Sequence, residues 1–171
     1  MTEIIRQRRP CDGCTLCCKV LEIPALSKPG GTWCVHCKAG VGCGVYEQRP
    51  GACAEFECGY IVGFTPDNWK PDKCKMVVVF EAGANRLVVH VDPGLPNAWR
   101  KEPFYGQIKK WAMAAQRREG SVVVAVDDRM TVVFPEREVH LGVVPPGKVI
   151  AWGRRMTQSG PEDFAHIADP E

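Results

Sequence analysis

The sequence predicts an α+β protein in which a cysteine-rich N-terminal lobe packs on a mainly antiparallel sheet with one principal helix. Nine of the ten cysteines fall between residues 11 and 58. Glycine and proline punctuate the same stretch, which has no periodic apolar pattern. After about residue 75, short apolar runs alternate with turn residues around one segment of helical periodicity. The lobe cannot bury a core of its own, so we expect metal to staple it.

Composition divides the chain into four parts. They are a polar arm (1–10), a cysteine-cluster metal-binding lobe (11–60), an α+β scaffold (61–152) and an irregular tail (153–171). A length of 171 residues also fits one integrated domain. Within the lobe we expect a short strand over residues 20–23. We also expect one or two helical turns from Pro50 to Phe56, because proline suits a first helical turn.

The scaffold should contain three hairpins and a helix. Residues 75–80 and 86–91 are strand-like and flank a plausible hairpin loop. A helix is predicted from Pro103 to Glu119, since proline suits its start and Gly120 its C-terminal cap. Two more hairpins are expected after it, the first pairing 121–126 with 131–134 and the second pairing 138–144 with 149–152.

Charge and apolar content argue against a nucleic-acid-binding, membrane-bound or secreted protein. A formal net charge of +2 is too small to indicate binding to nucleic acid or to an anionic membrane. No signal peptide is visible, and the longest apolar runs are far too short to span a bilayer. We therefore expect a cytoplasmic protein, where disulfides are rare and cysteine clusters more often bind metal.

Cysteine spacing is the strongest functional signal. A Cys-x-x-Cys turn can bring two sulfurs to one tetrahedral ion, and the pattern occurs at Cys11/Cys14, Cys14/Cys17 and Cys34/Cys37. Nine clustered cysteines exceed the four that one such ion accepts, so more than one Zn²⁺ is expected. The predicted ligands are Cys11, Cys14, Cys17, Cys18, Cys34, Cys37, Cys43, Cys53 and Cys58.

Disulfide bonding and core packing account for the cysteines less well than metal does. A disulfide framework would suit a secreted protein, and adjacent cysteines such as Cys17 and Cys18 rarely bridge each other. Reduced core cysteines would be scattered among apolar runs. We interpret Cys74, which lies outside the cluster, as a free structural thiol, and we expect none of the four histidines to be a ligand. A [4Fe-4S] cluster is the alternative cofactor, because sulfur ligands suit both zinc and iron–sulfur centres.

The neighbours Cys17 and Cys18 bear on the number of ions. In an extended chain their side chains point to opposite faces, which predicts that they serve different ions. A helix through residues 11–18 is the rival geometry, and it would place four cysteines on one face.

Two motifs in order resemble a known family. The first is Cys-x-x-Cys-x-x-Cys-Cys at 11–18, and the second runs from Cys43 through Tyr46, Arg49 and Pro50 to Cys58. Together they resemble the YkgJ-like cysteine-cluster proteins, a bacterial family described as a putative zinc- or iron-chelating domain. The resemblance covers roughly residues 11–60 and implies metal binding without a settled activity. We expect Arg49 to bond a thiolate or a loop carbonyl, and Tyr46 and Phe56 to shield the metal.

Three functions compete, and we rank them in order. The first is a protein with structural zinc that acts as an interaction or accessory module for another protein. The second is an iron–sulfur protein that supports electron transfer or an enzymatic reaction. An enzyme with catalytic metal ranks last, because such a metal keeps an open position beside a general base and no His/Glu pair stands out near the cysteines. We therefore predict no catalytic residue.

Overall fold

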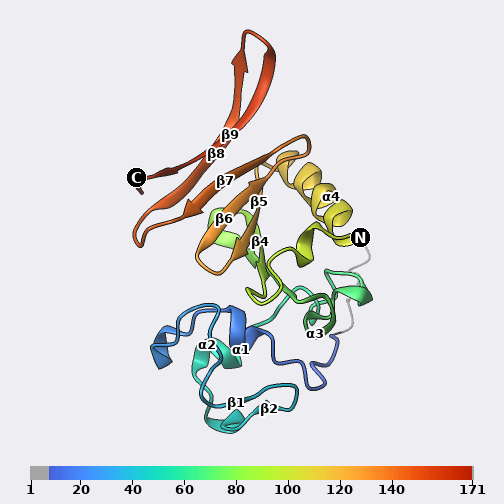
Figure 1. Ribbon diagram of the computed structural model, residues 1–171, viewed down its shortest axis with the longest axis vertical. Coiled ribbons are helices and arrows are strands. Elements are labelled where there is room, and N and C mark those ends of the chain that lie inside the picture. The colour runs from blue at the N-terminus through green and yellow to red at the C-terminus, as the bar shows by residue number, and fades with distance from the viewer. Residues whose placement is uncertain (1–7, 171) are drawn as a thin grey trace, which may run out of the picture.

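The computed structural model describes residues 8–170 and shows two parts joined end to end. The cysteine lobe forms one end of the molecule, and a sheet covered by the principal helix forms the other (Figure 1). A long β-ribbon made from the C-terminal segment projects beyond the sheet (Figure 1). The predicted α+β class, the mainly antiparallel pairing and the single principal helix are confirmed. Most of the predicted polar arm lies outside the described residues.

Only short regular elements occur in the described part of the lobe. The predicted strand over 20–23 is wrong, because Val20 ends a helical turn and Ile23 makes just an isolated bridge to Lys28. The predicted helical turn after Pro50 is confirmed, with that proline one residue before the helix. The elements are α1 (Cys17–Val20), β1 (Cys37–Lys38), β2 (Gly42–Cys43), α2 (Gly51–Ala54) and the 3-10 turns Pro24–Leu26 and Tyr46–Gln48.

Five strands form the main sheet in the order β3-β4-β5-β6-β7. Every neighbouring pair is antiparallel except β4 and β5, which run parallel with Arg86 opposite Ser121. Parallel strands need a long crossover, and here it carries α4 (Phe104–Gln116). The strands are β3 (Met76–Glu81), β4 (Arg86–Val91), β5 (Ser121–Val126), β6 (Arg129–Val133) and β7 (Glu138–Val143). Before them lie α3 (Pro71–Cys74) and the 3-10 turn Asp67–Trp69; two others, Ala82–Ala84 and Ala98–Arg100, lie in connections.

Both faces of the sheet are covered, which explains its continuous valine runs. On one face, Ile108 of α4 packs against Val122 and Val124 of β5. On the other face, Val123 meets Trp152 of the ribbon. The fold therefore has three layers at this point, with the central strand β5 enclosed between α4 and the ribbon.

An aromatic cluster fastens the segment before β3 to α4. The Trp69 side chain is 2% exposed. Its ring lies 5.1 Å from the ring of Phe104, at 86°, and 4.6 Å from that of Trp111. Phe64 stacks on the far side of this cluster, 5.4 Å from Trp111. Trp69 therefore ties the residues around α3 to the principal helix.

The C-terminal segment differs from the prediction. The expected hairpin of 138–144 with 149–152 is wrong, because β7 pairs with β6 instead. The expected irregular tail from residue 153 is also wrong: β8 (Val149–Thr157) and β9 (Gly160–Ala168) form a two-stranded ribbon. Its charged residues face each other across the strands, and Arg155 pairs with Glu162 at 2.9 Å. Such cross-strand ion pairs support a strand that has few apolar residues.

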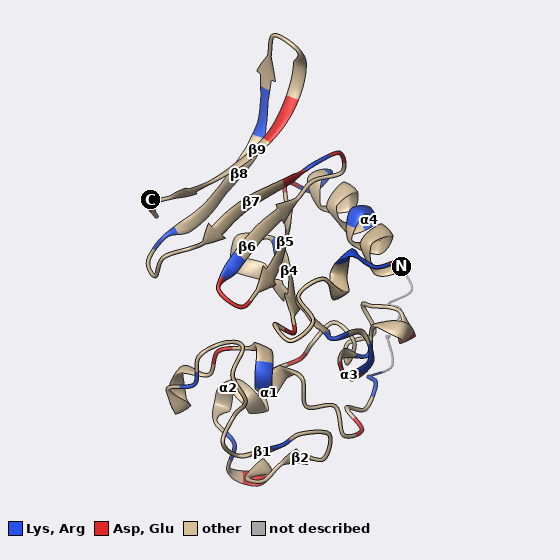
Figure 2. Ribbon diagram, viewed as in Figure 1, with Lys and Arg blue, Asp and Glu red and all other residues tan. Residues whose placement is uncertain are grey.

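The lobe and the sheet share contacts along β3. The Gly59 N–H donates to the Val78 carbonyl at 2.7 Å, and a side chain at Gly59 would meet Val78 and Thr65. Buried Cys58 packs with Val77 in the same apolar cluster. A salt bridge of 2.6 Å joins Lys19 of α1 to Asp92, just after β4. Basic and acidic positions occur in both parts (Figure 2).

Candidate metal centre

The nine predicted ligands fall into two neighbourhoods. Cys11, Cys14 and Cys58 lie close enough for their charges to act on one another, and we call them the first thiol group. The other six are linked by similar contacts. This second thiol group consists of Cys17, Cys18, Cys34, Cys37, Cys43 and Cys53. None of these cysteines forms a disulfide.

The first thiol group is built on a tight turn. The Cys14 N–H donates to the Cys11 carbonyl at 3.0 Å, and the turn between them has φ of 41° at Asp12 and 72° at Gly13. Gly13 readily adopts this positive φ because glycine has no Cβ. Cys58 arrives from a distant segment and is 5% exposed.

Burial opposes ionisation of two of these thiols, Cys11 and Cys14. Partial burial raises the pKa of Cys11, whose residue as a whole remains exposed, and the neighbouring Cys58 charge raises it further. Burial also raises the pKa of Cys14, although hydrogen bonds from the Leu16 and Asp72 backbone amides partly offset this. Amides directed at a sulfur stabilise its thiolate form.

Cys74 lies beside the first thiol group, on the scaffold side. It is 3% exposed, and its thiol donates to the Met76 carbonyl at 3.3 Å. Burial raises the pKa of Cys74 to about 12. These features are those of a protonated core thiol, while the expectation that Cys74 binds no metal stays a prediction.

A chain of hydrogen bonds runs through the second thiol group. The Gly40 N–H donates to Thr15 Oγ1 at 2.9 Å, and the Thr15 hydroxyl donates to the sulfur of Cys37. The Cys37 thiol donates to Cys18, which donates to Cys17. The bond to Cys17, together with burial, raises the pKa of Cys18 far above its ordinary value. Burial raises the pKa of Cys37 to about 11. The spacing analysis did not identify Thr15.

Cys17 and Cys18 lie next to each other at the start of α1. The premise of an extended chain at these residues is therefore wrong, and the helical rival is right only from Cys17 onward. Both thiols belong to the second group. Cys17 also packs in the apolar cluster that contains Cys14 and Cys58, so it lies between the two groups.

A buried lysine faces the second thiol group. Lys28 is 6% exposed, and its Nζ donates to the carbonyls of Lys19 at 3.0 Å, Pro29 at 2.8 Å and Leu21. Across residues 8–170, it forms no salt bridge with an aspartate or glutamate. Burial lowers the pKa of Lys28, whereas the nearby sulfurs raise it again. These sulfurs belong to Cys34, Cys18, Cys17 and Cys53.

The motif residues around Cys53 have mixed outcomes. Arg49 donates to the Tyr46 carbonyl at 3.1 Å and lies 3.7 Å over its ring, as expected for a residue that bonds a loop carbonyl. Burial raises the pKa of Cys53, and the Arg49 charge opposes that shift. Tyr46 is 59% exposed, so the expectation that it shields the cluster is wrong. Phe56 does pack against the apolar cluster of buried side chains that includes Cys58.

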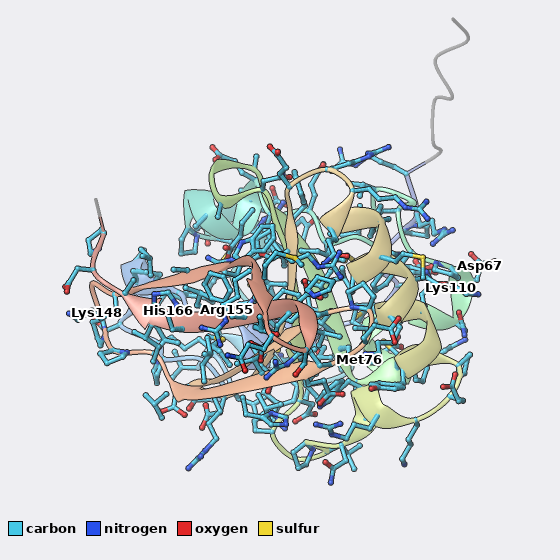
Figure 3. The ribbon with its side chains drawn as sticks, turned by 90° about the horizontal axis from the view of Figure 1, so that it is seen from above. Asp67, Met76, Lys110, Lys148, Arg155 and His166 are labelled. Carbon is cyan, nitrogen blue, oxygen red and sulfur yellow. The ribbon has the colours of Figure 1, made fainter. Side chains whose placement is uncertain are left out.

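Histidines lie mainly on the scaffold. His90 is on β4, His140 on β7 and His166 on β9, while His36 lies between Cys34 and Cys37. Burial lowers the pKa of His90 to about 4, and only the Glu81 charge opposes it. A hollow of about 330 Å³ opens on the ribbon, and Arg155 and His166, which Figure 3 labels, are among its lining residues.

Preformed ion-binding geometry is absent from residues 8–170. In that range no three Cys, His, Asp or Glu side chains are arranged to hold a metal ion. The thiols of each group are close enough to act on one another's pKa, but they do not form such an arrangement. No helix of the same range is long and apolar enough to cross a membrane.

No protein family, curated protein or solved structure matches this chain. The likeness to the YkgJ-like proteins therefore depends on the motif residues between Cys11 and Cys58.

Proposed function

We propose that this protein is a metal-binding accessory module that holds zinc in closed sites made of cysteine thiolates. Two thiol groups supply the donors, three in one and six in the other. A thiolate site of this kind would hold together a lobe whose regular elements are at most four residues long. We assign it no catalytic residue, and its partner would be another protein.

Buried Lys28 is the observation that supports this proposal best. Burying an ammonium group is costly unless the group is both hydrogen-bonded and beside a compensating negative charge. Its three carbonyl partners satisfy its N–H groups but carry no net charge. Neutral thiols would add none either. Four thiolates on one Zn²⁺ carry a net charge of about −2, which would more than compensate the single positive charge of the lysine.

The surroundings of the sulfurs agree with the same function. Backbone amides approach Cys14, and the Gly40–Thr15 chain ends on Cys37. Hydrogen bonds of this kind orient metal ligands and stabilise the thiolate form. A closed zinc site would hold these sulfurs at about 2.3 Å from the ion.

A [4Fe-4S] cluster is the second candidate, and the same buried cation favours it. Four cysteines around such a cluster also give an anionic site, and nearby positive charge would raise its reduction potential. Zinc keeps the first place because nine cysteines are more than one cluster uses.

The test is metal analysis of protein purified without oxygen, combined with native mass spectrometry. We expect a colourless protein with two or three zinc ions per chain. Lys28→Met should lower zinc affinity by roughly 10–100-fold, the usual effect of losing a group around the ligands. Lys28→Arg, which keeps the charge, should lose less.

Lys148→Met is the matched control, because Lys148 is a partly exposed ribbon lysine paired with Asp169. It should bind zinc like the natural chain. A brown protein absorbing near 400 nm would favour the iron–sulfur alternative. A natural chain that neither contains nor takes up metal would refute the proposal.

A further inference from the structure

The first thiol group has three cysteines, one fewer than a closed tetrahedral site needs. We propose that Asp72 supplies the fourth ligand through its Oδ1 oxygen, giving a site of three thiolates and one carboxylate. This inference rests on the proposed function. Asp72 lies outside the cysteine motif, and its type and spacing gave no signal in the sequence.

The position of Asp72 is fixed by contacts with the group. It is the second residue of α3, and its backbone N–H donates to the sulfur of Cys14. Its carboxylate charge acts on both Cys14 and Cys74. Trp69, packed under α4, holds this short helix against the scaffold. The carboxylate is therefore held beside Cys14, on the side of the thiol group that faces Cys74.

One oxygen of this carboxylate has no partner. Oδ1 is buried and makes no hydrogen bond within residues 8–170. The other oxygen, Oδ2, faces Lys70 Nζ at 3.7 Å. A buried acceptor without a donor is costly, and an anionic oxygen beside sulfurs is stabilised by a cation. A metal ion between Oδ1 and the sulfurs would remove this cost.

Cys74 is the competing fourth donor, and its contacts disfavour it. Its thiol already donates to the Met76 carbonyl. It also packs in the main core with Trp69 and Ile108. Recruiting its sulfur would break that hydrogen bond and draw a core residue toward the lobe. Asp72 has no such competing contact at Oδ1.

A carboxylate ligand would make the first site the more exchangeable one. Oxygen binds zinc at about 2.0–2.2 Å and is less suited to a soft site than thiolate. Cys11 is also exposed, so a chelator can reach the ion. We expect chelators to remove this ion before those of the second group.

Cobalt substitution tests the ligand set, because the intensity of thiolate-to-Co²⁺ charge transfer grows with the number of sulfurs. Asp72→Ala should lose one ion much faster to a chelator and keep the rest. Asp72→Cys should keep all ions and absorb more strongly. Cys74→Ser should keep full metal content.

Asp67→Asn is the control, because Asp67 is an exposed carboxylate nearby, paired with Arg9. It should release metal like the natural chain. Circular dichroism shows whether each variant folds, and Asp72→Cys still tests the ligand if Asp72→Ala does not. If both Asp72 variants release metal and absorb as Co²⁺ forms like the natural chain, and Cys74→Ser loses one ion, Asp72 is not the fourth ligand. That result would overturn this inference and leave the proposed function standing. A natural chain without metal would overturn it together with the proposed function.

Discussion

Replacing Trp69 by alanine should lower the free energy of unfolding by about 3–5 kcal/mol, the usual cost of removing a fully buried aromatic side chain. The residue is 2% exposed and touches two rings of α4, so the neighbours cannot close the space without moving the helix. For a chain of this length, that loss corresponds to roughly 6–20 °C in the midpoint of thermal unfolding.

Urea unfolding followed by far-ultraviolet circular dichroism is the suitable assay, because it does not depend on the tryptophan removed. Trp33→Ala is the matched control. Trp33 is 41% exposed, and among the aromatic and cationic groups of residues 8–170 it contacts only the Lys19 ammonium, so its loss should stay within about 1 kcal/mol. Equal effects of the two substitutions would refute the assignment of Trp69 as the anchor of the α3 segment.

Three further predictions concern the lobe, the sheet and the ribbon. Chelation should open residues 11–60 to limited proteolysis while the sheet resists, and uniform resistance would contradict metal as the staple of the lobe. Burial raises the pKa of Glu138, but hydrogen bonds, above all from Arg100, outweigh it and hold that pKa below its ordinary value. The ionised Glu138 carboxylate therefore stabilises the fold above the pKa that it has in the unfolded chain, and this stabilisation is lost as the pH falls through its pKa in the folded protein. Glu138→Gln should make the free energy of unfolding less dependent on pH in the acidic range. Asp163→Ala should lower the free energy of unfolding in urea by about 2–3 kcal/mol, because the buried carboxylate accepts a hydrogen bond from Gln116 at 2.8 Å. An unchanged midpoint of urea unfolding would show that Asp163 does not link the ribbon to the helix.

Local signals predicted the scaffold well up to Val133. The turn at Asn85, with φ of 44°, and the turn at Asp127, with φ of 57°, are sequence-local and give two hairpins. The parallel pairing of β4 with β5 could not be predicted from periodicity, because α4 separates the two strands in the sequence and periodicity reports only local structure. The ribbon was missed because Arg154 and Arg155 interrupt the apolar alternation, and their partners on β9 become visible only after pairing.

In the candidate site, spacing identified the cysteines but not their grouping. The two groups arise from folding, which brings Cys58 to the turn at Cys11 and leaves Cys17 beside Cys18. Lys28 lies between Ser27 and Pro29, a context typical of a solvated loop, and nothing local indicates its burial. Asp72 likewise resembles a polar residue of a helical first turn. Neither residue belongs to the cysteine motif, so the spacing of the cysteines could not point to them.

The hydrogen bond from Gly59 to the Val78 carbonyl has a consequence for solubility. Strand β3 lies at the edge of the sheet, and the chain around Cys58 covers part of that edge. Its sequence, Met76 to Phe80, is apolar and uncharged, with no proline to interrupt it. Uncovered edges of this composition template pairing between chains. Loss of the lobe should therefore produce concentration-dependent aggregation through β3, because the lobe protects this edge against self-association.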